Sequence, residues 1–109
     1  MNKSTISIDI HLDENKVPEQ INWTATDSTA DMMQAAKAMM VAFWDAKDKS
    51  ALRIDLWTKD MPVDEMKVFF HQTLVAMSET YHRATADEKM AATMKDFCDY
   101  FAEKLELKG

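Results

Sequence analysis

At 109 residues the chain has the length of one domain, and its 47% hydrophobic and 29% charged residues are ordinary for a globular protein. The net charge of −6 argues against nucleic acid and against an anionic membrane surface as partners, because both attract clustered Lys and Arg. A single cysteine, Cys98, excludes an intrachain disulfide, and the N-terminus lacks the apolar core of a signal peptide. The longest apolar run, residues 38–44, is too short for membrane insertion. We therefore expect a single domain over residues 1–109, located in the cytoplasm.

Two strands are predicted near the N-terminus. Apolar and polar residues alternate from Ile6 to Leu12 and again from Ile21 to Ala25, which is typical of strands with one buried face. A short polar connection containing Pro18 lies between them. Neighbouring strands with a short polar loop predict an antiparallel hairpin.

The next segment, from Met32 to Trp44, carries apolar residues at helical spacing, and we interpret it as an amphipathic helix. Possible N-cap residues precede it: Asp27, Ser28 and Thr29. Its methionines widen the apolar stripe beyond what one sheet needs. Either the helices cover one another, which we favour, or part of the stripe meets a partner.

The second half of the chain predicts one strand and two helices. Alternation from Leu52 to Thr58 indicates a third strand, and Pro62 then fits the first turn of a helix that reaches Tyr81. The sequence TADE, from Thr85 to Glu88, is a capping box that begins a last helix.

These elements predict an α+β fold in the order β-β-α-β-α-α. The alternation in all three strands predicts a three-stranded, mainly antiparallel sheet with three helices packed on one face. A helix between the second and third strands implies a crossover, so these two strands would be parallel, with the first strand between them. The other face of the sheet would be open to water or to a partner.

No motif in the sequence indicates catalysis, a metal site or a cofactor. His71 and His82 would lie about 16 Å apart on one helix, too far to share a metal ion, and His11 lies on a different element. Cys98 falls on an apolar helical stripe, where a thiol packs and does not react. With its one Gly at the C-terminus, the chain also lacks a phosphate-binding loop.

Trp57 is the residue that the alternation does not explain. Strict alternation places it on the polar face of its strand, with Arg53 and Asp55, and His11 would lie on the same open sheet face. An aromatic residue beside an arginine is typical of a protein-contact hot spot. The other interpretation is that Trp57 folds over the start of the next helix, against Pro62 or Met66. These two interpretations stay open.

Three long blocks resemble one known family. They are LDENKVPEQINWTATD (Leu12–Asp27), IDLWTKDMPVDEMKVFFHQTL (Ile54–Leu74) and DFCDYFAEKLEL (Asp96–Leu107). They are similar to the gliding motility-associated protein GldC family, and the resemblance extends from about Ile8 to Leu107. It implies a small cytoplasmic protein that supports the motility machinery, and it carries no catalytic residue over to this chain.

The residues and the resemblance together predict a non-enzymatic accessory protein that acts by protein–protein interaction. Its partner would belong to the motility machinery, and a homodimer through the open sheet face or a strand edge is also expected. The alternative is a small-ligand-binding protein or small enzyme that uses the open sheet face, which would need converging polar groups in a cleft. A chaperone-like holding function has only the methionine content in its favour.

Overall fold

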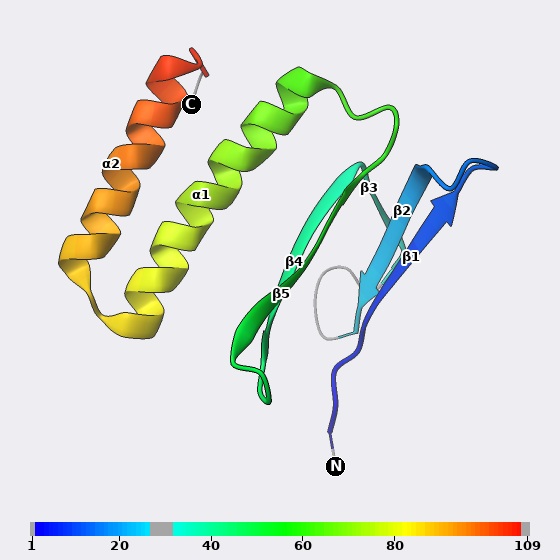
Figure 1. Ribbon diagram of the computed structural model, residues 1–109, viewed down its shortest axis with the longest axis horizontal. Coiled ribbons are helices and arrows are strands. Elements are labelled where there is room, and N and C mark those ends of the chain that lie inside the picture. Colours follow the sequence, from blue (N-terminus) through cyan, green and yellow to red (C-terminus); the bar gives the residue numbers. More distant parts are fainter. Residues whose placement is uncertain (1, 27–31, 108–109) are drawn as a thin grey trace. The chain divides into compact units, whose positions relative to one another are not determined.

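The computed structural model describes residues 2–26 and 32–107, which form five strands and two helices. The chain divides into two compact units, Met1–Met61 and Pro62–Gly109. The strands belong to the first unit and the helices to the second (Figure 1). The predicted α+β class is therefore confirmed, whereas three helices and one three-stranded sheet are wrong. A single domain over residues 1–109 stays a prediction.

The first sheet contains β1 (Ile6–Leu12), β2 (Pro18–Ala25) and β3 (Gln34–Ala36), in that order. β1 and β2 form the predicted antiparallel hairpin, with Ile8 opposite Trp23 and Ile10 opposite Ile21. Isoleucines and Trp23 therefore share one face of this hairpin, and Ser7, Asp9 and His11 lie on the other. β2 is the central strand, so the prediction that β1 lies in the middle is wrong. The predicted parallel pair is wrong as well, since all described strand pairs are antiparallel.

The turn between β1 and β2 is held by the Asp13 carboxylate. Its Oδ1 accepts hydrogen bonds from the backbone N–H groups of Asn15, at 2.8 Å, and Val17, at 3.0 Å. The hydrogen bond from Val17 is the main cause that lowers the pKa of Asp13 below its ordinary value. Lys16 takes a left-handed conformation here, with φ of 63°. Because the chain has no internal Gly, this turn must place a side-chain-bearing residue in that region.

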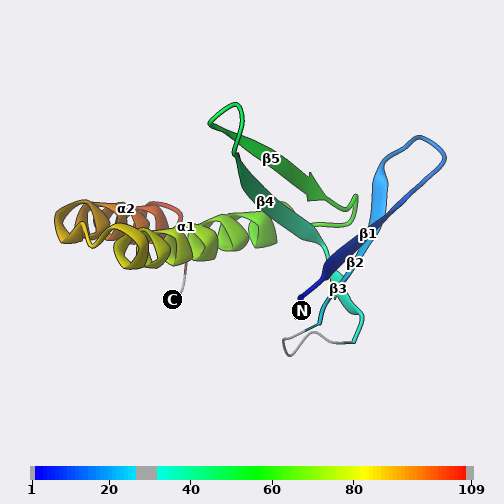
Figure 2. The same ribbon diagram turned by 90° about the horizontal axis from the view of Figure 1, so that it is seen from below.

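The Met-rich segment is a pair of strands, and the helix predicted there is wrong. β3 is followed by β4 (Ala38–Asp45), which pairs with β5 (Ser50–Trp57) in an antiparallel two-stranded sheet, as Figure 2 shows. Every residue in the run 38–44 is apolar, so it satisfies a helical period and a strand period equally. The N-cap candidates Asp27, Ser28 and Thr29 lie outside the described residues.

The turn between β4 and β5 explains why the hairpin forms. The Asp45 carboxylate accepts a hydrogen bond from the N–H of Asp48 at 2.7 Å, and Lys49 takes a left-handed conformation with φ of 52°. An Asp that bonds to its own backbone in this way favours a turn over a continuing helix. The third predicted strand is confirmed as β5.

The segment after β5 fastens the two-stranded sheet to the first sheet. The N–H of Thr58 donates to the carbonyl of Lys37 at 2.7 Å, and the N–H of Lys59 donates to the carbonyl of Pro18 at 3.0 Å. The Lys59 ammonium forms an ion pair with Asp13 at 3.1 Å. Thr58 is buried, and its hydroxyl bonds to Asp60. These contacts join the end of β5 to the start of β2.

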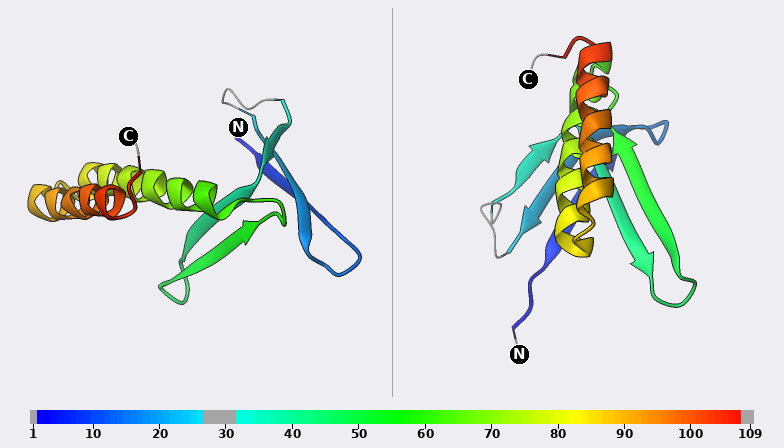
Figure 3. Two further views of the ribbon diagram at one scale, coloured as in Figure 1. Left: turned by 90° about the horizontal axis from the view of Figure 1, so that it is seen from above. Right: turned by 90° about the vertical axis from the view of Figure 1, so that its left-hand side faces the viewer.

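The second unit is an antiparallel helical hairpin of α1 (Val63–Thr85) and α2 (Glu88–Lys104), seen side by side in Figure 3. Both helices were predicted. Pro62 is the N-cap of α1, one residue before the helix. Ser78 of α1 and Ala91 and Cys98 of α2 are the buried residues of these helices. His71 stacks on Phe101, with ring centroids 6.0 Å apart, so this histidine packs between the helices.

The N-cap of α2 is Asp87, so the capping box predicted to start at Thr85 is wrong. The Asp87 carboxylate accepts hydrogen bonds from the N–H of Met90, at 3.1 Å, and from the hydroxyl of Tyr81, at 2.9 Å. Thr85 instead ends α1, donating its hydroxyl to the carbonyl of Tyr81. Ala86, left-handed with φ of 59°, connects the two helices. Asp87 therefore ties the end of one helix to the start of the next.

We expect Asp87 to make the helical hairpin sensitive to acid. The hydrogen bond from Met90 is the main cause that lowers the pKa of Asp87 below its ordinary value of 3.8. Its stabilisation is therefore complete above that value and is lost as the pH falls through the lowered pKa. Thermal unfolding followed by far-UV circular dichroism should show a steeper acid loss for the native chain than for Asp87→Asn, which keeps a capping side chain without the charge. Identical pH profiles for the two proteins would contradict this assignment.

Candidate functional site

The candidate site is one face of the two-stranded sheet. Because Ala38 lies opposite Trp57 and the strands alternate, eight side chains share this face. We call it the tryptophan face, and it consists of Ala38, Met40, Ala42 and Trp44 of β4 with Ala51, Arg53, Asp55 and Trp57 of β5. It contains two tryptophans, one at each end, with an ion pair between them.

Both tryptophans are exposed. Trp57 is 57% exposed and Trp44 is 68% exposed. They lie six residues apart along the hairpin, a separation of roughly 20 Å. Most tryptophans in folded proteins are largely buried, so two exposed on one strand face are a feature to be explained. More than half of the surface of each tryptophan is therefore accessible.

The charged residues between the tryptophans pair with each other. The Arg53 guanidinium forms two hydrogen bonds with the Asp55 carboxylate, from Nε at 3.1 Å and from Nη2 at 2.8 Å. These hydrogen bonds are the main cause that lowers the pKa of Asp55 and raises that of Arg53. The two charges cancel locally, so the tryptophan face is neutral on a protein of net charge −6.

His11 does not belong to this face. It lies on β1 opposite Gln20, on the polar face of the three-stranded sheet, together with Ser7 and Asp9. The structure thus brings together three of the four predicted contact residues, Trp57, Arg53 and Asp55, and places His11 on a different sheet. The separation follows from β5 pairing with β4 instead of joining the first sheet.

Sequence reasoning missed Trp44 and Met40, which were assigned to a helix. The available signal was the spacing of two segments of strand length, one apolar and one alternating, around the polar connection DAKDK. Had that connection been interpreted as a hairpin turn, the register would have placed Trp44 on the same face as Trp57. The single-sequence pattern gave equal weight to a helix.

The opposite face of the two-stranded sheet is apolar except beside the turn. It consists of Met39, Val41 and Phe43 of β4 with Leu52, Ile54 and Leu56 of β5, and it ends at the pair Asp45 and Ser50. Phe43, Leu52 and Ile54 are each about half exposed or more. The tryptophan face differs by carrying both a charge pair and hydrogen-bonding indoles, which give a contact surface specificity as well as buried area.

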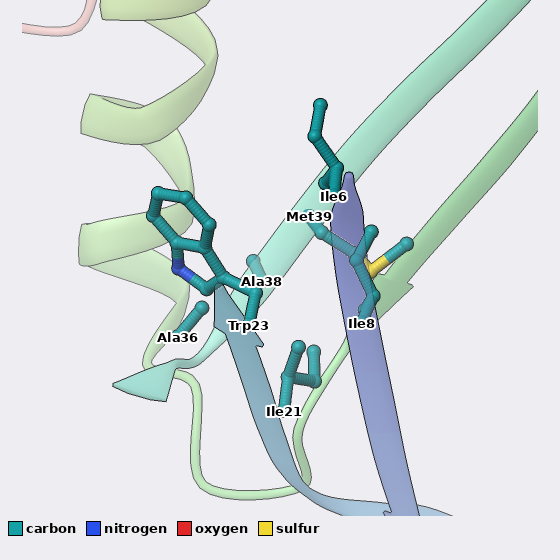
Figure 4. Close-up of a pocket in the computed structure, with 7 residues that line it drawn as sticks. All are labelled: Ile6, Ile8, Ile21, Trp23, Ala36, Ala38 and Met39. Atoms are coloured by element: carbon teal, nitrogen blue, oxygen red, sulfur yellow. The ribbon is translucent and has the colours of Figure 1, made fainter. Parts of the chain in front are cut away.

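A hollow of about 210 Å³ lies within the first unit, against the apolar face of the three-stranded sheet (Figure 4). Its lining consists of Ile6, Ile8, Ile21, Trp23, Ala36, Ala38 and Met39. The indole nitrogen of Trp23 is the sole polar side-chain atom among them, so the hollow has no set of converging groups to orient a polar substrate. It therefore lends no support to the enzyme interpretation.

In the described part of the chain, the titratable residues give no indication of a metal site or of a reactive thiol. Among residues 2–26 and 32–107, no group of three His, Cys, Asp or Glu side chains is placed to hold a metal ion. Burial raises the pKa of the Cys98 thiol, which lowers its reactivity. No helix within the described ranges is both long enough and apolar enough to cross a membrane.

The fold and the site define a small α+β protein with an exposed aromatic strand face. The chain belongs to the GldC-like family of gliding motility-associated proteins, because residues 18–107 match the family described as gliding motility-associated protein GldC-like. The resemblance found in the sequence is thereby confirmed. Comparison with curated proteins gave no match, and comparison with solved structures gave none.

Proposed function

We propose that this protein is a non-enzymatic accessory protein of gliding motility that acts in the cytoplasm by binding a protein partner through the tryptophan face. The observation that carries the proposal is the pair of exposed tryptophans on either side of the Arg53–Asp55 ion pair. Tryptophan and arginine are the residues most enriched in interface hot spots. Family membership supports the process, and the tryptophan face supports the mode of action.

The chemistry of the face indicates what it would bind. Since Arg53 and Asp55 neutralise each other, the partner need not supply a strong charge, and the binding energy would come from burial of the two indoles. A partner with two apolar depressions roughly 20 Å apart, separated by neutral hydrogen-bonding groups, would fit this face. We expect its affinity to depend only weakly on salt.

Replacing Trp57 by alanine should weaken partner binding strongly while leaving the fold intact. Truncation of a hot-spot tryptophan weakens binding about 30-fold or more. The test is photo-crosslinking in the native cells, followed by affinity measurement with the purified partner. Trp44→Ala should act in the same direction, and Phe43→Ala, on the opposite face of the same strand, is the matched control.

Two outcomes would contradict the proposal. One is a partner whose affinity is unchanged in Trp57→Ala and Trp44→Ala but reduced in Phe43→Ala, which would assign binding to the opposite face. The other is a large loss of thermal stability in Trp57→Ala, which would assign the side chain to packing. Circular dichroism of the purified variants separates the second outcome from a true binding defect.

A further inference from the structure

β1 leaves one of its two edges without a strand partner. The order β1-β2-β3 places β1 at the border of the first sheet, as Figure 1 shows. Among the described residues, no strand pairs with the outer side of β1. The opposite border is β3, which is three residues long, whereas β1 has seven residues and contains neither Lys nor Pro. Short strands, lysines and prolines are the usual devices that protect an edge from pairing, so β1 is the less protected border.

The hydrogen-bonding pattern identifies which residues of β1 face outward. The N–H of Thr26 donates to the carbonyl of Thr5 at 3.0 Å, so Thr5 and Thr26 form a hydrogen-bonded pair. Such pairs recur at every second residue of an antiparallel ladder, which directs the backbone groups of Ser7, Asp9 and His11 toward β2. The N–H and C=O groups of Ile6, Ile8 and Ile10 therefore point away from the sheet.

We propose that a second copy of this chain pairs with β1 in an antiparallel arrangement whose two-fold axis passes through Ile8. In this register Ile8 lies opposite its own counterpart and Ile6 lies opposite Ile10, so all outward-facing groups of these three residues meet partners. The isoleucine faces of the two sheets become continuous. On the polar face, Ser7 of each copy lies opposite Asp9 of the other, where its hydroxyl can donate to the carboxylate.

Self-complementarity is the reason to propose a second copy instead of another peptide. Ile6 and Ile10 are placed symmetrically about Ile8, as a two-fold interface requires. A register centred on Asp9 would oppose two carboxylates, which destabilises a strand pair. A register centred on Ile10 would need Leu12, where the pairing with β2 shifts. The chain therefore favours the register centred on Ile8.

The apolar hollow supports this register. Ile6 and Ile8 line it, and Ile6 is 71% exposed. Pairing at the β1 edge would place isoleucines of the second copy beside those of the first and cover part of this exposed surface. The pairing uses none of the residues of the tryptophan face, so it can hold whether or not the proposed function does.

Cysteine crosslinking tests the register. Residues opposite each other in a hydrogen-bonded pair have Cα atoms about 5.5 Å apart, within the disulfide range of about 4.4–6.8 Å. Ile8→Cys should therefore form a covalent dimer under mild oxidation, whereas Leu12→Cys, whose counterparts would be roughly 27 Å apart, should not. The native chain controls for Cys98, which is 2% exposed.

Light scattering of the native chain over a wide concentration range tests the assembly itself, and a rising two-copy fraction is expected. Ile8→Pro removes an outward N–H that β2 does not use, and should weaken association about tenfold or more relative to Ile8→Ala. A mass of one copy at every concentration would overturn the proposal. Equal crosslinking of Ile8→Cys and Leu12→Cys would overturn it as well, whether or not Ile8→Pro folds.

Discussion

Replacing Ile21 by alanine should lower the free energy of unfolding of the strand-bearing unit by about 2–5 kcal/mol. Ile21 is 1% exposed and is the single fully buried hydrophobic residue among the described residues of Met1–Met61. It lies on the central strand, between Ile10 of β1 and Ala36 of β3. Its truncation would leave a cavity that joins the hollow lined by Ile21. Neighbouring side chains could then fill little of this cavity, which raises the cost of the substitution.

Chemical denaturation followed by tryptophan fluorescence measures this loss, since Trp23 reports on the same sheet. The matched control is Ile6→Ala, which removes the same atoms from a side chain that is 71% exposed, and we expect it to cost far less. Equal destabilisation by the two substitutions would show that burial at the central strand is not what holds this unit together.

Replacing Ala91 by leucine should destabilise the helical hairpin by about 1–3 kcal/mol, because the larger side chain cannot be accommodated. Ala91 is 9% exposed, and it lies seven residues before Cys98, on the same face of α2. The buried residues of the two helices are all small: Ala91 and Cys98 of α2 and Ser78 of α1. A leucine at position 91 would push the helices apart at their shared surface.

Thermal unfolding of the helices by far-UV circular dichroism is the measurement. Met90→Leu is the matched control, since it introduces the same side chain one position earlier on a residue that is 50% exposed, with little change in volume. If Ala91→Leu raised the melting temperature, the leucine would have filled space between the helices, and the close packing described here would be refuted.

The sequence predicted those elements whose pattern allows one interpretation. Strict alternation located β1, β2 and β5, and the Pro62 signal followed by helical spacing located α1. The prediction for the segment Met32–Trp44 was wrong because its side chains are almost all apolar. The pattern of apolar and polar residues therefore could not distinguish a helix from a strand. The β4–β5 turn was the feature that distinguishes two strands from a helix. It is a short Asp-containing connection and lacks glycine, which is the stronger turn signal.

The candidate site was predictable in part for the same reason. Alternation alone puts Trp57 on the face of Arg53 and Asp55, because those residues follow one another within a single strand. Which residues lie opposite each other on two paired strands depends on the register of the pair. A single sequence specifies this register weakly when both faces of a strand are apolar. Trp44 and the separation of His11 therefore required the structure.

Three connecting turns each contain a residue in a backbone conformation that is unfavourable for it. Lys16, Lys49 and Ala86 each have positive φ, in a region where an L-residue with a side chain is less stable by roughly 1–2 kcal/mol. The carboxylate hydrogen bonds of Asp13 and Asp45 hold two of these turns, and the flanking strands and helices constrain all three. Evolution or design could therefore replace each of the three by glycine at little conformational penalty, whereas lengthening or cutting an adjoining strand or helix would release the turn that it constrains.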